Sequence, residues 1–511
     1  MADFRANQAA VWLLLCALLS PLESSHGRQA VEAGLLEQAE RELFAARHRK
    51  AAELYAAVLE RNPEHAHARY GLVRALLRDR RSLEAHTVAD EGLRRNPDSP
   101  PALAAGGMSA LRRGDIVRAE ALFREAVKID PDYHGGLQGL ARILQALSQY
   151  KSAESLMLRA YRNYPNDPDL MLAHADTLKG AEHIAALERV LPILDPQSDE
   201  ALRLRGHLAF DRVTGDKILR RLLSPYTAAK IKLRLIQNGP QRAIGWGVNV
   251  RLNDRQSATL LLDTGASGVN ISRKIAQRAN LASVTGASTM ARGIGDDPAP
   301  TAYSYLASKL KVDDVEFADY PVSVFESAAT ESYDGLISPG VFGRFIVRID
   351  FPRGELLLEP RPEGEPKNSD DLTDVGPAPQ GFHRVLRLGS LLAVPTSVNG
   401  APFSLFAIDS GATVTVIDTE IASMSASVHR DDGVSVKGIQ GEVDKVSTTE
   451  RVVLRFAGFQ QDNASLVAVS LSNVSDSLGI GLGGVLGMPL LAQLTVTLDY
   501  RQSAVRFDYK K

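Results

Sequence analysis

Residues 260–266 read LLLDTGA, and residues 406–412 read FAIDSGA. Each stretch is a short apolar run, typical of a buried strand, that ends in an aspartate followed by a hydroxyl residue, a glycine and an alanine. A single Asp-Thr-Gly or Asp-Ser-Gly tripeptide marks ordinary turns in many proteins. Two such tripeptides, each after the same kind of strand, indicate a duplicated unit.

The duplication extends beyond the two aspartates. When Asp263 is aligned with Asp409, the turn dipeptide ND at 253–254 falls on NG at 399–400, and both dipeptides are typical of tight hairpins. Further downstream, RGIG at 292–295 corresponds to KGIQG at 437–441. After a short shift, DGLI and IDF (334–337 and 349–351) correspond to GGVL and LDY (483–486 and 498–500). One segment is therefore a divergent copy of the other.

Residue composition and the pattern of apolar residues set the limits of the two copies. After about residue 226 the chain reads as short alternating strands with Val, Ile, Thr and glycine turns. A stretch rich in Pro, Gly and Asp interrupts this pattern between residues 359 and 381, and such a composition favours a linker. We predict a first lobe at 226–360, a linker at 361–380 and a second lobe at 381–511.

This arrangement resembles the retropepsin-like aspartic proteases over about residues 226–509. The resemblance implies two all-β lobes that associate within one chain as a pseudo-dimer, with Asp263 and Asp409 as the catalytic pair. It further implies supporting residues in the two Asp loops, namely Thr264, Gly265, Ser410 and Gly411. The implied flap and substrate-binding residues are Gly293, Ile294, Gly295, Gly438, Ile439 and Gly441. The first lobe departs from the family pattern at 338–339, where Ser-Pro stands in place of a glycine.

The chemistry explains why such residues would be duplicated. Peptide hydrolysis without a metal or a covalent nucleophile needs a base to activate water and an acid to protonate the departing amine. Two carboxyl groups held face to face share one proton, because two like charges so close cannot both ionise. Each lobe supplies one carboxyl group, and the glycine after it lets backbone amides approach. No metal site and no cofactor are implied.

The first half of the chain has a different character. From about residue 34 to 219, apolar residues recur at helical spacing. Four prolines stand 34 residues apart, and a set of small residues keeps the same interval; the prolines are Pro63, Pro97, Pro131 and Pro165. This period resembles the tetratricopeptide repeat (TPR), which implies an α-solenoid. Repeats of this family usually present a concave surface to a peptide or protein partner, although they can also be spacers.

The N-terminus has the order of a signal peptide. Arg5 precedes an apolar run from Ala9 to Leu19, and small residues follow at 25–27. The run is shorter than the about 20 residues that a bilayer-spanning helix needs. We therefore predict a signal peptide at 1–27, export to the periplasm or outside the cell, and no membrane span after cleavage. The only cysteine, Cys16, lies in this run, so the mature chain holds neither a disulfide nor a cysteine nucleophile.

These observations predict a multidomain α + β chain: a TPR solenoid at 34–219, followed by an aspartic endopeptidase that acts on a peptide or protein substrate as a monomer. The formal charge of −2 argues against a nucleic-acid partner. Three alternatives stay open. The protease fold can be a non-catalytic peptide-binding module, the repeats can act as a scaffold that carries the function, or the lobes can pair between chains.

Overall fold

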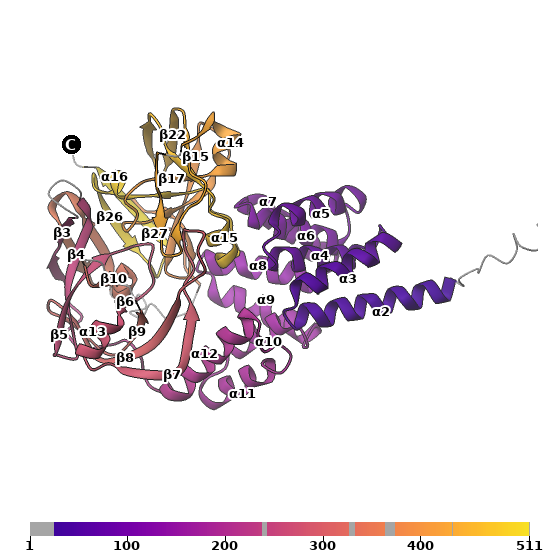
Figure 1. Cartoon of the computed structure of the whole chain (residues 1–511), viewed down its shortest axis with the longest axis horizontal. Coiled ribbons are helices and arrows are strands. Elements are labelled where there is room, and N and C mark those ends of the chain that lie inside the picture. Colours follow the sequence, from indigo (N-terminus) through magenta and orange to yellow (C-terminus); the bar gives the residue numbers. More distant parts are fainter. Residues whose placement is uncertain (1–24, 238–242, 327–332, 363–373, 432, 510–511) are drawn as a thin grey trace, which may run out of the picture.

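The computed structural model describes residues 25–237, 243–326, 333–362, 374–431 and 433–509. Figure 1 shows helices from the first part of the chain lying against a larger body of strands from the second part. Residues 1–24, which hold most of the predicted signal peptide, lie outside the described residues. Within the described ranges, each helix is too short or too polar to cross a lipid bilayer.

The described N-terminal part folds into eleven helices that run in antiparallel pairs. Helix α6 contacts both α4 and α8, so these three form an inner row, and the helix that follows each of them forms an outer row. The helices are α2 (Ser25–Phe44), α3 (His48–Arg61), α4 (Ala66–Arg78), α5 (Ser82–Arg95), α6 (Pro100–Arg112), α7 (Ile116–Ile129), α8 (His134–Ala146), α9 (Tyr150–Asn163), α10 (Pro168–Ala175), α11 (Gly180–Val190) and α12 (Asp199–Thr214).

Small residues set the spacing between the paired helices. The alanines that recur with the 34-residue period are fully buried; they are Ala51, Ala85, Ala119 and Ala153. A Cβ atom on Gly107 or on Gly139 would collide with the ring of Phe123, so both glycines make room for that ring. These contacts explain why the sequence keeps small side chains at fixed intervals.

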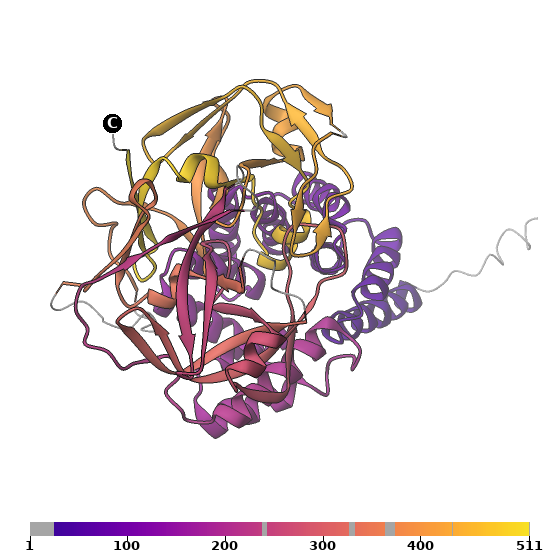
Figure 2. The same ribbon diagram turned by 60° about the vertical axis from the view of Figure 1, so that its left-hand side comes forward.

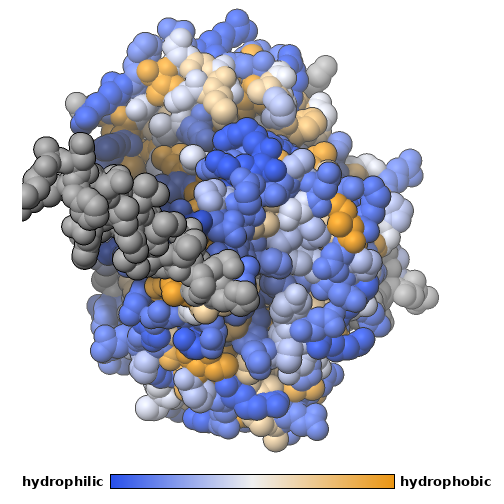
Figure 3. Space-filling model, turned by 90° about the vertical axis from the view of Figure 1, so that its right-hand side faces the viewer, coloured by the Kyte–Doolittle hydropathy of each residue, from blue (hydrophilic) through white to orange (hydrophobic). Residues whose placement is uncertain are grey.

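The face in Figure 3 is largely hydrophilic, with hydrophobic residues in small, separate patches.

The first lobe is a nine-stranded sheet in which the pairing of β8 with β9 closes a barrel. At the Asn253-Asp254 turn both residues have positive φ, as the ND dipeptide predicts. Short helices α13 (Arg273–Arg278) and η1 (Pro339–Phe342) follow two of the strands. The strands are β1 (Arg221–Leu222), β3 (Arg234–Gln237), β4 (Ala243–Leu252), β5 (Gln256–Leu262), β6 (Val269–Ser272), β7 (Ala282–Met290), β8 (Thr301–Val312), β9 (Val315–Phe325) and β10 (Gly335–Ile337).

The second lobe repeats this plan with a ten-stranded sheet and a separate short hairpin. The hairpin consists of β19 (Lys437–Gly438) and β20 (Gly441–Glu442). The main strands are β14 (Leu386–Leu388), β15 (Leu391–Val398), β16 (Ser404–Ile408), β17 (Val416–Asp418), β18 (Val428–Arg430), β21 (Ser447–Thr449), β22 (Val452–Phe456), β23 (Phe459–Asn463), β24 (Val467–Val469) and β25 (Gly484–Leu486). The helices are α14 (Thr419–Ser425), α15 (Ser472–Leu478) and α16 (Met488–Leu491).

A third sheet joins the two lobes, and its central strands β11 and β26 come from different lobes. Arg348 pairs with Thr497, which occupies the same position in the second copy, so an approximate twofold axis passes between these strands. The sheet contains β2 (Ala229–Lys232), β11 (Ile346–Asp350), β12 (Glu355–Glu359), β13 (His383–Arg384), β26 (Leu494–Asp499) and β27 (Ala504–Tyr509). The predicted pseudo-dimer is confirmed, and it forms within one chain.

Asp350 and Asp499 each cap the turn after their strand in the interlobe sheet. The backbone N–H of Arg353 donates to Asp350 Oδ1 at 3.2 Å, and that of Gln502 donates to Asp499 Oδ1 at 2.8 Å. Both capping roles follow from the strand-then-turn context of the sequence. Arg361, at the start of the predicted linker, also forms a buried ion pair with Asp499, with Nη1 3.1 Å from Oδ2. Residues 363–373 of the linker lie outside the described residues.

The helical part and the lobes share a continuous apolar core. One cluster of buried side chains contains residues of the inner helices together with Leu386, Leu405 and Val485 of the second lobe. Helix α8 lies against β14, and α12 lies along β7 of the first lobe. Figure 2 shows the inner helices behind the strands of both lobes. The solenoid is therefore packed on the protease-like body.

Candidate active site

Asp263 and Asp409 occupy equivalent places, each directly after a strand that pairs in parallel with a strand from later in the same lobe. Strand β5 pairs in parallel with β10, and β16 pairs in the same way with β25. The N–H of Asp263 donates to Ile337 O at 2.9 Å, and the N–H of Asp409 donates to Leu486 O at 3.1 Å. The same backbone hydrogen bond therefore fixes both aspartates.

The Ser338-Pro339 departure leaves this arrangement intact. Ser338 is fully buried, and its N–H donates to Gly268 O at 2.8 Å. Its hydroxyl oxygen accepts from the N–H of Gly340 at 3.2 Å, which caps η1. The serine thus finds partners for its own polar groups, and Asp263 keeps the backbone hydrogen bond to Ile337 O that corresponds to the bond of Asp409 to Leu486 O.

Thr264 and Ser410 brace the two loops across the lobe boundary. The Thr264 hydroxyl donates to Ile408 O at 2.7 Å and accepts from the N–H of Ser410 at 2.8 Å. The Ser410 hydroxyl donates to Leu262 O at 2.7 Å and accepts from the N–H of Thr264 at 3.1 Å. All four hydrogen bonds join one lobe to the other. They are buried, so breaking one leaves polar groups without water as a replacement partner.

The two carboxyl groups face each other. In each loop Oδ1 accepts two backbone N–H groups: Gly265 at 2.7 Å and Ala266 at 3.0 Å for Asp263, and the matching pair at 2.8 Å and 3.1 Å for Asp409. A Cβ on Gly265 would lie 2.5 Å from Asp409 Cγ, and a Cβ on Gly411 would lie 2.6 Å from Asp263 Cγ. Each glycine is therefore required because the opposite lobe's carboxyl group occupies that space.

The surroundings raise the pKa of both aspartates. Burial is the largest cause for each carboxyl group, and the negative charge of Asp409 raises the pKa of Asp263 further, well above its ordinary value. Hydrogen bonds from the loop N–H groups oppose this by stabilising the ionised forms. The pair therefore holds one proton into a pH range where isolated aspartates have none.

The predicted flap segments meet each other. The tip of the β7–β8 connection holds Gly293 to Gly295, and the β19–β20 hairpin holds Gly438 to Gly441. Gly438 packs on the backbone of Ile294, and Gly293 packs on the side chain of Ile439. The two tips therefore contact each other across the lobe boundary.

Gln440 joins the flaps and was not among the predicted site residues. Its N–H donates to Ile294 O at 3.0 Å, and its Oε1 accepts from the N–H of Gly293 at 2.9 Å. Its side-chain Nε2 donates to Asp297 O at 3.0 Å. Gln440 is the extra residue in KGIQG relative to RGIG, and that extra residue was the available signal.

The helical part and the second lobe hold the first flap from outside. Arg292 forms an ion pair with Asp199 at the start of α12. A Cβ on Gly206 of α12 would collide with the carbonyl of Ser288 in β7, so this glycine lets the helix lie directly on the flap strand. From the second lobe, Asn473 Nδ2 donates to Gly295 O at 3.1 Å. These contacts also escaped prediction because they join distant segments.

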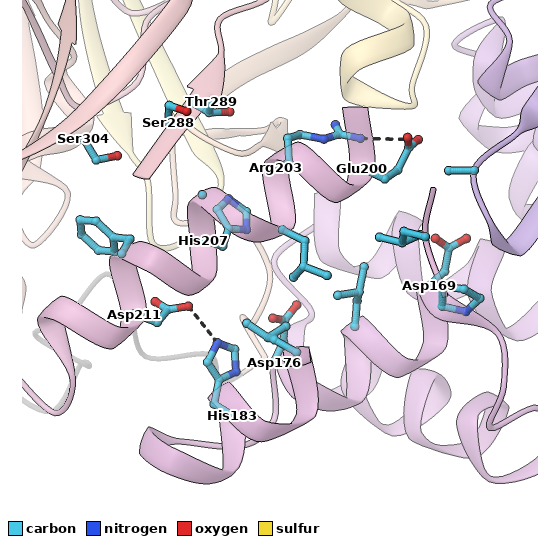
Figure 4. A pocket seen from close by; sticks show the side chains of 18 of the residues that line it. Asp169, Asp176, His183, Glu200, Arg203, His207, Asp211, Ser288, Thr289 and Ser304 are labelled. Atoms are coloured by element: carbon cyan, nitrogen blue, oxygen red, sulfur yellow. Dashed lines mark ion pairs between the residues drawn. The ribbon is translucent and has the colours of Figure 1, made fainter. Parts of the chain in front are cut away.

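A cavity of 710 Å³ lies between the helices and the first lobe, apart from the aspartate pair. Its lining includes α12 and the flap strands β7 and β8, as Figure 4 shows. Two ion pairs lie in its lining: His183 with Asp211 at 3.5 Å, and Arg203 with Glu200 at 3.7 Å. Within the described ranges, no group of three or more His, Cys, Asp or Glu side chains is placed to hold a metal ion.

Comparisons with known proteins agree with this architecture. The family model described as aspartyl protease matches twice, at residues 248–344 and 394–490. The model described as tetratricopeptide repeat also matches twice, at 44–106 and 110–176. A comparison with curated proteins gives no match.

Solved structures with similarity to the chain include three that align with little more than a third of it. A thermophilic TPR protein of Thermus thermophilus is 20% identical, with 36% of this chain and 99% of that chain covered and a TM-score of 0.28. The Cut9–Hcn1 hetero-tetramer of the APC/C is 17% identical (42% and 39% covered, TM-score 0.31). PilF of Pseudomonas aeruginosa is 18% identical (37% and 88% covered, TM-score 0.24). The chain thus contains two retropepsin-like aspartyl protease domains, preceded by tetratricopeptide repeats.

Proposed function

We propose that this protein is an aspartic endopeptidase whose catalytic pair is Asp263 and Asp409. The observation that carries the proposal is the reciprocal packing of Gly265 and Gly411, each of which lies against the carboxyl group of the opposite lobe. Two buried carboxyl groups in this relation share a proton, which provides a base and an acid in one site. The matches to the aspartyl protease model support the same reaction class.

The reaction assigns one role to each carboxyl group. The ionised carboxylate, assigned to Asp409, takes a proton from a water molecule as the water oxygen bonds to the scissile carbonyl carbon. The protonated carboxyl, which we assign to Asp263, donates its proton to the carbonyl oxygen. Asp409, which now carries the proton taken from water, donates it to the amide nitrogen as the C–N bond breaks, and one hydroxyl of the diol returns its proton to Asp263. The products are a carboxylic acid and an amine, and no cofactor takes part.

The remaining assignments concern substrate binding and cellular context. Thr264 and Ser410 hold the two loops in register, and the flap residues around Ile294 and Ile439 cover an extended peptide in the cleft. The repeats recruit the substrate or a protein partner, as repeats of this family commonly do. The protein acts as a monomer after export and removal of residues 1–27.

Hydrolysis of a mixed peptide library tests this proposal. Wild-type protein is expected to cleave the library, and a transition-state-type inhibitor of aspartic proteases is expected to block cleavage. Asp263→Asn and Asp409→Asn each keep the shape of the side chain but remove its ability to ionise, so each is expected to lose at least about 10³-fold in kcat. Undiminished cleavage by either variant excludes the shared pair. A wild-type protein that binds peptides without cleaving them instead supports the non-catalytic alternative.

A further inference from the structure

Three arginines gather where the inner helices meet the second lobe. Arg78 ends α4, Arg112 ends α6, and Arg142 lies in the last turns of α8. The second lobe faces them with α15 and the loop that follows it. Figures 1 and 2 both place α15 beside the inner helices. We call Arg78, Arg112 and Arg142 the arginine cluster.

Acidic side chains neutralise two members of the arginine cluster. Arg78 forms an ion pair with Asp169 of α10. Arg112 forms an ion pair with Asp476 of α15, and its Nη1 also donates to Ser475 O at 3.2 Å. The guanidinium of Arg142, in contrast, has no ion pair and no side-chain hydrogen bond with any described residue. One positive charge of the cluster is therefore free.

The free guanidinium lies against the second lobe and still reaches solvent. A Cβ on Gly479, the first residue after α15, would lie 3.4 Å from Arg142 Nη1. Gly479 has a φ of +72°, so it is in the left-handed region that favours glycine, and the loop approaches the arginine without a side chain. The side chain of Arg142 is nevertheless exposed. Part of Arg142 therefore remains accessible to a ligand from solvent.

The electrostatic environment favours an anion at this place. Although part of Arg142 is exposed, the protein atoms around its guanidinium desolvate it, and this lowers its pKa. The negative charge of Asp169 acts in the opposite direction, and the positive charges of Arg78 and Arg74 lower the pKa further. Burial likewise lowers the pKa of Arg112, and Arg142 adds to that shift. An anion bound here stabilises the charged form of every arginine in the cluster.

We propose that the arginine cluster forms a subsite for a carboxylate of the bound peptide, with Arg142 as its main ligand and the loop at Gly479 as its wall. This inference rests on the proposed peptide substrate of the aspartate pair. A guanidinium offers a planar fork of donors that matches the two oxygens of a carboxylate. The carboxylate comes from an acidic side chain or from a C-terminus. The subsite is composite, since the repeats supply the charge and the second lobe encloses it.

The position of the subsite connects it with the cleft. Helix α15, which precedes the loop, bonds the first flap through Asn473 and Gly295. After the loop the chain enters β25, whose Leu486 carbonyl accepts the N–H of Asp409. One short segment therefore links the arginine cluster, the flap and a catalytic carboxyl group. A peptide held at Arg142 therefore contacts a segment that also bonds the flap and supports the loop of Asp409.

Direct binding tests the subsite without relying on hydrolysis. Three labelled peptides of otherwise equal sequence are compared by fluorescence anisotropy on the full-length Asp409→Asn chain, which does not turn them over under the proposed mechanism. The first has an internal Glu and an amidated C-terminus, the second has Gln and the amide, and the third has Gln and a free C-terminal carboxylate. We expect the first or the third to bind about tenfold more tightly than the second. Which of the two binds more tightly identifies the source of the carboxylate.

Substitutions then assign the effect to Arg142. Added to the same chain, Arg142→Gln is expected to remove the tenfold preference, and Arg142→Lys to keep part of it because the charge remains. The matched control is Arg162→Gln, an exposed arginine on the outer helix α9, which is expected to keep the full preference. Equal binding of all three peptides, or an unchanged preference in Arg142→Gln, overturns the inference. Carboxylate-dependent binding in a chain whose wild type hydrolyses nothing supports the subsite while it contradicts the proposed reaction.

Discussion

Gly265→Ala is the substitution whose effect the structure defines most sharply. The new methyl carbon would lie 2.5 Å from Asp409 Cγ and 2.6 Å from its Oδ2, well inside ordinary van der Waals contact. The φ of Gly265 does not require a glycine, so the collision with the opposite carboxyl group is the main consequence. To restore normal contact, the Asp409 carboxyl group must move away by about 1 Å. A displacement of that size in a catalytic group costs roughly 100-fold in rate.

The assay is the steady-state hydrolysis of one cleavable peptide, with kcat and KM determined separately. The loss is expected in kcat, because the methyl group displaces a reacting carboxyl group and leaves the flap contacts untouched. Gly411→Ala, whose Cβ would lie 2.6 Å from Asp263 Cγ, is expected to give a similar loss. Gly376→Ala is the control, since no atom lies within 4 Å of its added Cβ. Wild-type kcat in both loop variants would refute the facing arrangement of the carboxyl groups.

Three further changes follow from individual contacts. Thr264→Val removes the hydroxyl that accepts from the Ser410 N–H and donates to Ile408 O. Each buried polar group left without a partner costs roughly 1–3 kcal/mol, so the urea concentration at the midpoint of unfolding should fall. An unchanged midpoint contradicts a stabilising role for these hydrogen bonds between the lobes. Ala266→Thr adds a hydroxyl donor beside the Asp263 carboxyl, and a hydrogen bond from this hydroxyl stabilises the ionised carboxylate. The raised pKa of Asp263 should therefore fall. The basic limb of the plot of kcat/KM against pH should move about one unit toward lower pH. A limb that stays in place speaks against Asp263 as the proton donor. Arg361→Met leaves the buried carboxylate of Asp499 without its cation. The free energy of unfolding, measured by thermal denaturation, should fall by about 3–5 kcal/mol. A loss below about 1 kcal/mol would contradict the burial of this ion pair.

Much of the architecture could be predicted from sequence because it depends on local patterns that occur twice. The apolar strand before each aspartate, the Asn253 and Asn399 turns and the 34-residue period of prolines each specify a short element. The equivalence of the two copies then predicts the twofold arrangement, since a carboxyl pair needs one loop from each lobe. The match of IDF with LDY likewise placed Asp350 and Asp499 at equivalent positions, and in the structure each caps the turn after its strand.

Other features depend on contacts between segments far apart in the chain, and the sequence offers no local sign of them. Gly206 of α12 reads as an ordinary helical glycine until β7 is placed on it. Gln440 reads as an exposed residue of a hairpin tip, yet it is buried in the first flap. Arg142 is one arginine among many in the repeats, and only the approach of Gly479 distinguishes it.

The departure at Ser338 illustrates a different limit. A family glycine replaced by Ser-Pro suggests a change in the loop beneath Asp263. In the second lobe, a Cβ on Gly487 would collide with the carbonyl of Val414, so glycine is required there. In the first lobe the N–H of Ser338 bonds the carbonyl of Gly268, whereas the N–H of Gly487 bonds the Thr415 hydroxyl, so the backbone differs locally. The Ser338 hydroxyl then accepts from the N–H of Gly340. Whether a substitution is tolerated depends on those partners, which a motif does not contain.

The central claim is that Asp263 and Asp409 of the same chain form one catalytic site. Peptide hydrolysis by Asp263→Asn, by Asp409→Asn and by an equimolar mixture of the two variants, each beside wild type, tests it most directly. We predict activity in the wild type and none in either variant or in their mixture, because each chain carries its own damaged pair. Hydrolysis that reappears in the mixture would show that the lobes pair between chains, and hydrolysis by either single variant would show that the two carboxyl groups do not act together.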